Sequence, residues 1–239
     1  MGKAMFRRLA LVLIAAAILL PSMVAVAKPV ELEPTSNDGI LTFASDDGMF
    51  KWWIDTRIYL DTAFYMEDKA DLGSGMQIRR ARMAWKAILW EDWYAEVDAD
   101  FAEEATAMKD AYVRYDNVFN RQGYVRMGNF RTPFGLEENT SSRYIMFMER
   151  SQGTDAFVPG RRMGFEVANW GDMYRVALAA FGPDVEDFET EDVDMNWNFA
   201  ARATVAPIMD QHKVLHVGGA YAMMKPTFTD ENDVGEVRF

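Results

Sequence analysis

Hydrophobic and polar residues alternate over long stretches of this chain. From Phe50 to Met66, apolar residues occupy most even positions and charged residues occupy several of the odd ones. Side chains of a β-strand point alternately to opposite faces, so this pattern predicts a strand with one apolar face and one charged face. A run of this length is unusual for a soluble sheet, whose strands commonly have about 5 or 6 residues.

The next two stretches carry opposite charge on their polar faces. The first, Met76 to Trp90, is basic, and the second, Trp93 to Phe101, is acidic. If they form a hairpin, cations and carboxylates face each other across the two strands. The basic column consists of Arg80, Arg82 and Lys86, and the acidic column consists of Glu96, Asp98 and Asp100.

Two registers of this hairpin match the polar faces. A three-residue loop pairs Lys86 with Asp98, whereas a five-residue loop pairs Lys86 with Glu96 and Arg82 with Asp100. Such pairs contribute about 0.2–1 kcal/mol each, so they fix the register more than they stabilise the fold. We expect these pairs to neutralise part of the column, so that any cations left free lie toward Arg80 and Arg82 rather than at Lys86.

The alternation recurs and predicts nine strands. No convincing helix follows residue 27, although Glu103 to Lys109 is a candidate for a single helical turn and Ser141 to Glu149 for a short helix inside a loop. No change of composition marks a second folded domain. The nine stretches are Phe50 to Met66, Met76 to Trp90, Trp93 to Phe101, Lys109 to Asp116, Gly123 to Arg131, Arg161 to Asn169, Met173 to Phe181, Met195 to Val205 and Val214 to Met223.

Two architectures accommodate such strands. In a transmembrane antiparallel β-barrel the apolar faces meet lipid and the cations line water, whereas in a secreted or periplasmic soluble β-sandwich binding module the apolar faces share a core. Aromatic residues near the predicted strand ends fit either a membrane-interface belt or a sandwich core. They are Trp52, Trp53, Trp90, Trp93, Trp170 and Tyr174.

The first 27 residues have the pattern of a secretory signal peptide. Three basic residues precede an apolar run that ends in Ala25-Val26-Ala27, which are small residues at the spacing of a cleavage site. We expect cleavage after Ala27, then an N-terminal segment (28–49) and a β-domain (50–239). The mature chain has 22 Lys and Arg against 37 Asp and Glu, a net charge of −15, which argues against nucleic acid as a partner.

Catalytic and metal-binding patterns are not evident in the sequence. The chain has no cysteine, which excludes disulfides and thiolate ligands. His212 and His216 fall in or beside a predicted strand, where their spacing is too wide for one metal ion. The acidic run from Asp184 to Asp194 lacks the glycine of an EF-hand loop and is expected to be an exposed loop. We therefore expect no enzyme activity, no cofactor and no metal.

A long segment separates two of the predicted strands. It is Met127 to Ser151, MGNFRTPFGLEENTSSRYIMFMERS, and it is too long for a hairpin turn. This segment resembles the corresponding part of the phosphate-selective porin O and P family. Three further blocks resemble the family in order and spacing, namely Arg79 to Arg82, Lys109 to Val113 and Gly160 to Phe165.

The resemblance implies a sixteen-stranded outer-membrane barrel, usually a homotrimer, in which a long loop folds into the lumen. Basic residues along that lumen would let small anions such as phosphate or polyphosphate diffuse through passively. Rings of arginine or lysine select anions, and the planar guanidinium matches phosphate oxygens. Since nine strands are fewer than sixteen, we expect the chain to be an N-terminal piece of a longer barrel.

The resemblance also implies particular lumen residues. Of the arginine-rich block, strand parity directs Arg80 and Arg82 inward. Arg131 and Arg143 belong to the loop block, and Arg162 lies on the inward face of the strand after it. The loop block contains no lysine, so the solute is left open between phosphate and other small anions.

Overall fold

The structure is a computed structural model that describes residues 32–37, 40–66, 73–102, 106–182, 197–210 and 212–225. All of these belong to one compact unit, Leu32–Phe239. The predicted signal peptide, the acidic run from Asp184 to Asp194 and the terminal Phe239 lie outside the described residues. The predictions for those three features therefore stay predictions.

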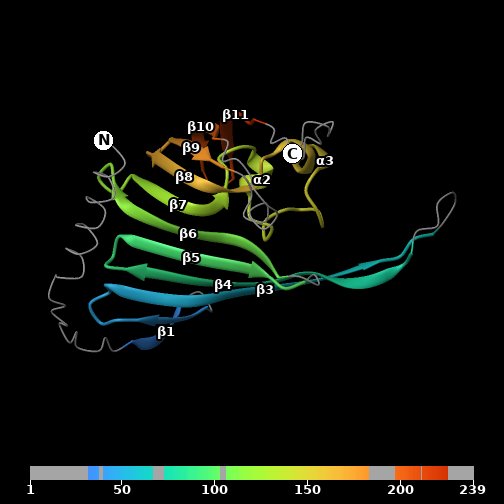
Figure 1. Ribbon diagram of the computed structural model, residues 1–239, viewed down its shortest axis with the longest axis horizontal. Coiled ribbons are helices and arrows are strands. Elements are labelled where there is room, and N and C mark those ends of the chain that lie inside the picture. Colours follow the sequence, from blue (N-terminus) through green and yellow to red (C-terminus); the bar gives the residue numbers. More distant parts are fainter. Residues whose placement is uncertain are drawn as a thin grey trace, which may run out of the picture. The chain divides into compact units, whose positions relative to one another are not determined.

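The described residues form one antiparallel sheet in which each strand pairs with its neighbours in sequence (Figure 1). Two short helices, α2 (Leu136–Asn139) and α3 (Gln152–Phe157), lie in the long connection between β7 and β8. The strands are β1 (Glu33–Asn37), β2 (Ile40–Ala44), β3 (Phe50–Ala63), β4 (Gly75–Leu89), β5 (Trp93–Asp100), β6 (Ala107–Val118), β7 (Gly123–Arg131), β8 (Arg161–Trp170), β9 (Tyr174–Phe181), β10 (Asn198–Met209) and β11 (Val214–Met223).

All nine predicted strands are present as β3 to β11, and the hairpin of β1 and β2 adds two more. The candidate helix over Ser141 to Glu149 is wrong, because these residues form turns and bends while α2 and α3 flank them. Among the described residues, helix is thus confined to two short segments of the long connection between β7 and β8.

The sheet buries polar residues on one face and exposes apolar residues on the other. On the inward face Arg80 is 5% exposed and Asp98 is 1% exposed, whereas Ile58 and Leu60 on the outward face are 69% and 74% exposed. A soluble protein shows the reverse distribution. The described strands all lie in this one sheet, which contradicts the alternative of a soluble β-sandwich.

Among the described residues, we find no helix with the length and apolar character needed to cross a membrane.

The three longest connections between strands all lie at one end of the sheet. Three short turns, at residues 90–92, 119–122 and 171–173, join β4 to β5, β6 to β7 and β8 to β9. The connections of residues 64–74, 132–160 and 182–197 are much longer, and all join strands at the other end. This asymmetry is typical of outer-membrane barrels, which have short turns on one side and long loops on the other.

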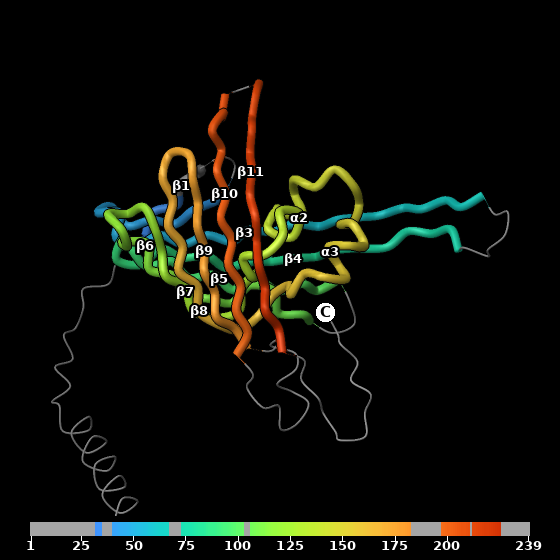
Figure 2. The backbone as a smooth tube through the Cα atoms, turned by 90° about the horizontal axis from the view of Figure 1, so that it is seen from above, coloured from blue at the N-terminus to red at the C-terminus, as the bar shows by residue number. Residues whose placement is uncertain are grey.

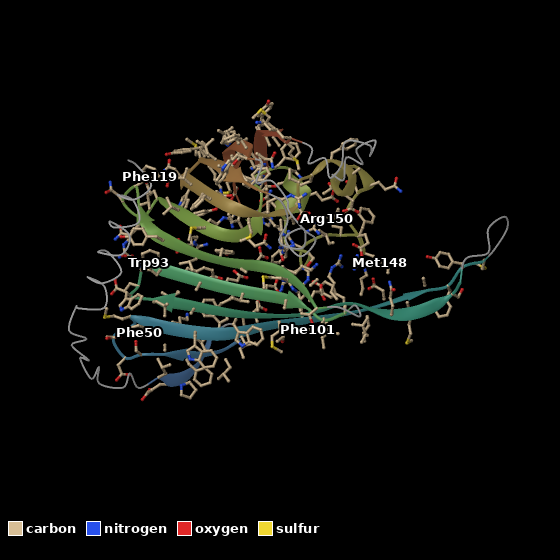
Figure 3. The ribbon with its side chains drawn as sticks, viewed as in Figure 1. Phe50, Trp93, Phe101, Phe119, Met148 and Arg150 are labelled. Carbon is tan, nitrogen blue, oxygen red and sulfur yellow. The ribbon has the colours of Figure 1, made fainter. Side chains whose placement is uncertain are left out.

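Aromatic side chains gather at the end that carries the short turns. In Figure 3 the labelled Phe50, Trp93 and Phe119 lie near this end of the sheet. Phe50 packs edge-on against Trp90 at 5.9 Å between ring centroids. Trp53 instead packs against Tyr94 of the inward face at 6.2 Å, so it does not belong to an outward belt.

The strand direction changes steeply across the sheet. Figure 2 shows that β9, β10 and β11 run across the direction of β3 and β4. In both views α2 and α3 lie beside β11 and over β3 and β4, on one side of the sheet (Figures 1 and 2). The curved sheet therefore has an inner face that the long loop partly covers.

Candidate functional site

The hairpin of β4 and β5 has the second of the two predicted registers. Lys86 pairs with Glu96 and Arg82 pairs with Asp100. Leu89 also pairs with Trp93, so the connecting turn has three residues instead of the five expected for this register. The basic and acidic columns thus face each other on the inner side of the sheet.

Ion pairs engage every charged residue of the two columns on β4 and β5. Arg82 Nε lies 2.7 Å from Asp100 Oδ2, and Lys86 Nζ lies 3.3 Å from Glu96 Oε1. Asp98 faces Ala84 across the ladder, and its partner is Arg57 of β3 at 3.3 Å. Lys86 also lies 3.2 Å from Asp55 Oδ2 of β3, so two carboxylates hold this one ammonium group.

A bulge brings a further arginine to the loop side of the sheet. The register between β3 and β4 shifts between Tyr59 and Leu60, which leaves Arg79 as the extra residue of β4. Arg79 and Arg80 both donate to the carboxylate of Glu149 in the loop, with 2.6 Å from Arg80 Nη2 to Glu149 Oε2. The alternation of side chains along the strand predicted that Arg80 points inward and Arg79 does not, because alternation alone does not reveal a bulge.

Two arginines, Arg131 at the end of β7 and Arg150 in the long loop, bind the first part of that loop. Its stem closes where the Thr132 amide donates to the Gly160 carbonyl at 3.0 Å. The Glu138 carboxylate forms ion pairs with two arginines, at 3.5 Å from Arg131 Nε and 3.2 Å from Arg150 Nε. The same two side chains donate to the Thr140 carbonyl at 3.1 and 2.9 Å.

A glutamate links the two helices of the loop. Glu137 of α2 accepts hydrogen bonds from the Ser151 hydroxyl at 2.6 Å, from the Thr154 hydroxyl and from the Ser151 amide at 3.0 Å. These donors, the Ser151 hydroxyl above all, hold the pKa of Glu137 below the ordinary range of a glutamate. The link therefore keeps α2 and the start of α3 together at neutral pH.

The loop reaches across the inner face of the sheet. Arg143 forms an ion pair with Asp55 of β3, and Arg57 of β3 donates to the Ser142 hydroxyl at 3.4 Å. Together with the pairing of Glu149 to β4, these contacts show that a loop between β7 and β8 spans β5 and β6. Figure 3 shows the labelled Met148 and Arg150 on this loop side of the sheet. The predicted infolding of the loop is confirmed.

Carboxylates at the loop are shared between cations. Glu149, Asp55 and Glu138 each bind two basic side chains. We call these ion pairs, together with those of β3, β4 and β5, the loop network, in which eight cations meet six carboxylates. Its members are Arg57, Arg79, Arg80, Arg82, Lys86, Arg131, Arg143 and Arg150 with Asp55, Glu96, Asp98, Asp100, Glu138 and Glu149.

The expectation of free cations at Arg80 and Arg82 is wrong, because each has a carboxylate partner. Any positive excess of the loop network comes from sharing. Arg162 lies on the inward face opposite Phe130 and donates a hydrogen bond to the Arg161 carbonyl at 3.3 Å. Arg161 pairs with Asp110 at 2.6 Å.

A second group of arginines surrounds Tyr124 on the inward faces of the later strands. The guanidinium carbons of Arg114, Arg126 and Arg175 lie 5.2, 5.6 and 5.7 Å from the Tyr124 ring centre. A cavity of about 590 Å³ borders all four residues. Our interpretation of the sequence did not single out these arginines, although their parity was a signal that could have found them.

Comparison with known proteins decides the family. The model of the family "Phosphate-selective porin O and P" matches residues 53–238. The chain belongs to this family. It is similar to Porin O of Pseudomonas aeruginosa, with 24% identity over 205 residues, which covers 77% of this chain and 44% of the relative. It is also similar to an uncharacterised protein of Caulobacter vibrioides, with 28% identity over 216 residues, or 82% of this chain and 42% of that protein.

The match confirms the predicted family and identifies the type of fold to which the open sheet belongs. The antiparallel strands belong to a porin-type β-barrel, although the described sheet is not closed. The chain spans less than half the length of the two relatives named above.

Proposed function

We propose that this chain forms part of an outer-membrane porin through which small anions, including phosphate and polyphosphate, diffuse passively past arginines. The observation that carries the proposal is the sharing of Glu149, Asp55 and Glu138 by two cations each. Sharing of Glu149 and Glu138 leaves an excess of two positive charges in the loop network, whereas Arg143 and Lys86 are balanced by Asp55 and Glu96. The family supports a phosphate-selective porin as the broader class.

Shared carboxylates suit conduction because they make each anion site weak. An anion that reaches Arg79 competes with Glu149, which Arg80 also holds. Conduction requires sites that attract the ion and still release it. Arg79 and Arg143 are the accessible members of the shared pairs, with 35% of each side chain exposed, whereas the Arg80 side chain is 6% exposed.

The test removes charge without leaving a carboxylate unpaired. In the double variant Arg79→Gln with Arg143→Gln, Glu149 keeps Arg80 and Asp55 keeps Lys86. A unit charge at ~4 Å contributes about 1 kcal/mol in water. We therefore expect the permeability ratio of chloride or phosphate over potassium to fall about fivefold for each arginine removed. Reversal potentials in planar bilayers under a salt gradient measure this ratio.

Arg121→Gln is the matched control, because Arg121 lies in the turn between β6 and β7 and its side chain is 60% exposed. Its removal should leave the ratio close to that of the unaltered protein. A cation preference of the unaltered protein would overturn the proposal. Arg82→Ala is less suitable, because it leaves Asp100 unpaired where only 11% of that side chain is exposed.

The proposal also includes two partners of the chain, membrane lipid and further copies of the same chain. The apolar outward face, with Ile58 and Leu60 exposed, suits contact with outer-membrane lipid. The family resemblance further favours a homotrimer. Cross-linking of the purified protein in detergent tests this assembly, and a product that stops at the monomer would contradict it.

A further inference from the structure

An apolar groove indents the outward face of the sheet over β8, β9, β10 and β11, the last three of which lie side by side in Figure 2. Its volume is about 530 Å³. Sites that hold one small organic ligand have volumes of about 300–1,000 Å³ and mostly apolar walls. The groove therefore has the size and the lining of a site for one apolar chain.

Two alanines form the floor of this groove, Ala180 of β9 and Ala201 of β10. Each of them lies in the ladder between two large residues of the neighbouring strands, whose side chains are about half exposed. These neighbours are Phe165 and Phe199 for the first alanine and Leu178 and Tyr221 for the second. The groove is thus a result of the sequence, because small and large residues meet across the pairing of four strands.

The groove lies toward the end of the sheet that carries the long connections. Ala180 is the last residue but one of β9, and Phe199 is the second residue of β10, so both lie beside the connection of residues 182–197. In outer-membrane barrels the long loops are extracellular. In a membrane the groove would therefore face the acyl chains of the outer leaflet.

A tryptophan and a lysine lie beyond the groove at this same end. Trp197 stacks on Phe165 at 6.4 Å between ring centroids. Phe199 pairs with Met223, and two residues further along both strands this register brings Trp197 and Lys225 to one level. Both side chains are exposed. Tryptophan is enriched at membrane–water interfaces, and lysine reaches the interface with its ammonium group.

The distance from the groove to this interface fits a lipid. Lys225 follows Tyr221 by four residues, which is roughly 13 Å along an extended strand. Half of the apolar band of an outer-membrane barrel is about 12 Å tall. A lipid with an acyl chain in the groove would thus have its head group near Lys225, whose positive charge favours an anionic head group.

We propose that this groove binds one acyl chain of an anionic lipid of the outer leaflet, with Lys225 at the head group. A second copy of the chain would instead need a broad contact of about 800 Å² on each partner. The lysine at the end of the groove gives the lipid a charge complement that such a contact does not require. This site rests on the membrane location proposed above and adds to it a particular lipid at a particular place.

Native mass spectrometry of the full chain in non-ionic detergent tests the charge of the lipid. The probes are dimyristoyl phosphatidylglycerol, which is anionic, and dimyristoyl phosphatidylcholine, which has the same acyl chains and no net charge. We expect saturable binding of phosphatidylglycerol, about fivefold tighter than that of phosphatidylcholine, as one lysine near an anionic head group would give. Lys225→Gln should abolish this preference.

Lys213→Gln is the matched control for the charge, because Lys213 is an exposed lysine in the turn between β10 and β11 at the opposite end of the sheet. It should keep the preference for phosphatidylglycerol. Equal affinity of the unaltered protein for the two lipids would overturn the inference.

A second variant tests the groove itself. Ala201→Phe fills its floor and should weaken the binding of both lipids roughly tenfold, the loss expected when about two methylene groups leave the groove. Ala95→Phe is the matched control, because Ala95 faces outward on β5, where it pairs with Ala87 and Val113 away from the groove. Both variants should show the same heat-dependent migration on gels as the unaltered protein.

Equal lipid affinity in Ala201→Phe and Ala95→Phe would overturn the assignment of the groove. So would a change of oligomeric mass in Ala201→Phe with unaltered lipid binding, because the groove would then hold a second copy. An anion-selective channel without this lipid binding would refute the lipid site alone, whereas lipid binding in a cation-selective channel would refute the proposed function alone.

Discussion

Gly128 and Gly164 sit side by side in the ladder between two aromatic residues. Gly128 pairs with Tyr112 on one side and with Gly164 on the other, and Gly164 pairs in turn with Phe181. A Cβ atom on Gly128 would lie 2.3 Å from the Ala111 carbonyl oxygen and 2.6 Å from Tyr112 Cα. Its φ of +131° also lies in a region that L side chains rarely adopt. The backbone therefore requires glycine at this position.

We predict that Gly128→Ala destabilises the folded protein by about 1–3 kcal/mol through overpacking against backbone atoms. The midpoint of urea unfolding in lipid vesicles, followed by tryptophan fluorescence, measures the change. Gly153→Ala is the control, because nothing lies within 4 Å of its added Cβ and Gly153 is in α3. That control should be neutral or slightly stabilising. Equal midpoints for the two variants would contradict the steric argument.

Strand parity located much of the site at the level of single residues. It placed Arg80, Arg82 and Arg162 on the inward face, and it paired Lys86 with one of two acidic partners that the sequence offered. It could not give the partner of Arg80, because Glu149 lies in a loop with no periodic pattern. Long-range contacts of this kind depend on the path of the loop.

The long loop is held to the sheet mainly by charge, which makes its position an electrostatic property. Glu149 and Arg143 provide its ion pairs with β4 and β3. The apolar side chains between them contribute little packing, because Met146 is 92% exposed and Phe147 is 76% exposed. Loss of one ion-pair anchor should therefore loosen this part of the loop while the strands remain paired.

We predict that Glu149→Gln increases hydrogen exchange and protease cleavage over residues 143–150 without changing exchange in β4. The variant leaves Arg79 and Arg80 without their shared carboxylate, so the two like charges also repel each other. Mass spectrometry of deuterated peptides from the protein in detergent makes the comparison. Glu91→Gln, in the exposed turn between β4 and β5, is the matched control.

Unchanged exchange over residues 143–150 in Glu149→Gln would contradict the view that this ion pair anchors the loop. Increased exchange in the control would point instead to a general loss of stability.

At the scale of elements, long alternating runs were predictable and short ones were not. The fifteen residues of β4 show one apolar and one charged face, which is a strong signal. β1 and β2 have five residues each and lie in the segment 28–49, where we predicted no strand. β1 pairs with β2, and β2 pairs with β3 through Thr42 to Ala44, contacts that no local pattern shows.

The outward face of the described sheet is apolar, and this face determines whether the protein can dissolve in water without detergent. Residues of several strands contribute to it, among them Leu60 (74% exposed), Tyr221 (66%) and Leu178 (52%). Soluble monomers rarely expose apolar patches larger than a few hundred Å². A bilayer or detergent would cover such a face.

We predict that the protein in cell envelopes resists extraction with salt and enters solution only with detergent. On gels in sodium dodecyl sulfate, unheated samples should migrate differently from boiled samples, because a closed barrel resists unfolding by detergent. A sample that is boiled before loading is the control. Recovery in buffer without detergent would contradict insertion in the membrane.

The described sheet contains an odd number of strands, eleven, and every pairing in it is antiparallel. The two edges, β1 and β11, consequently run in the same direction. Joining them directly would create a parallel pair, which single-chain bacterial outer-membrane barrels, with their even strand counts, do not contain. A closed barrel that includes all eleven strands with uniform antiparallel pairing thus needs an even total, and the sixteen strands implied by the family resemblance satisfy that condition.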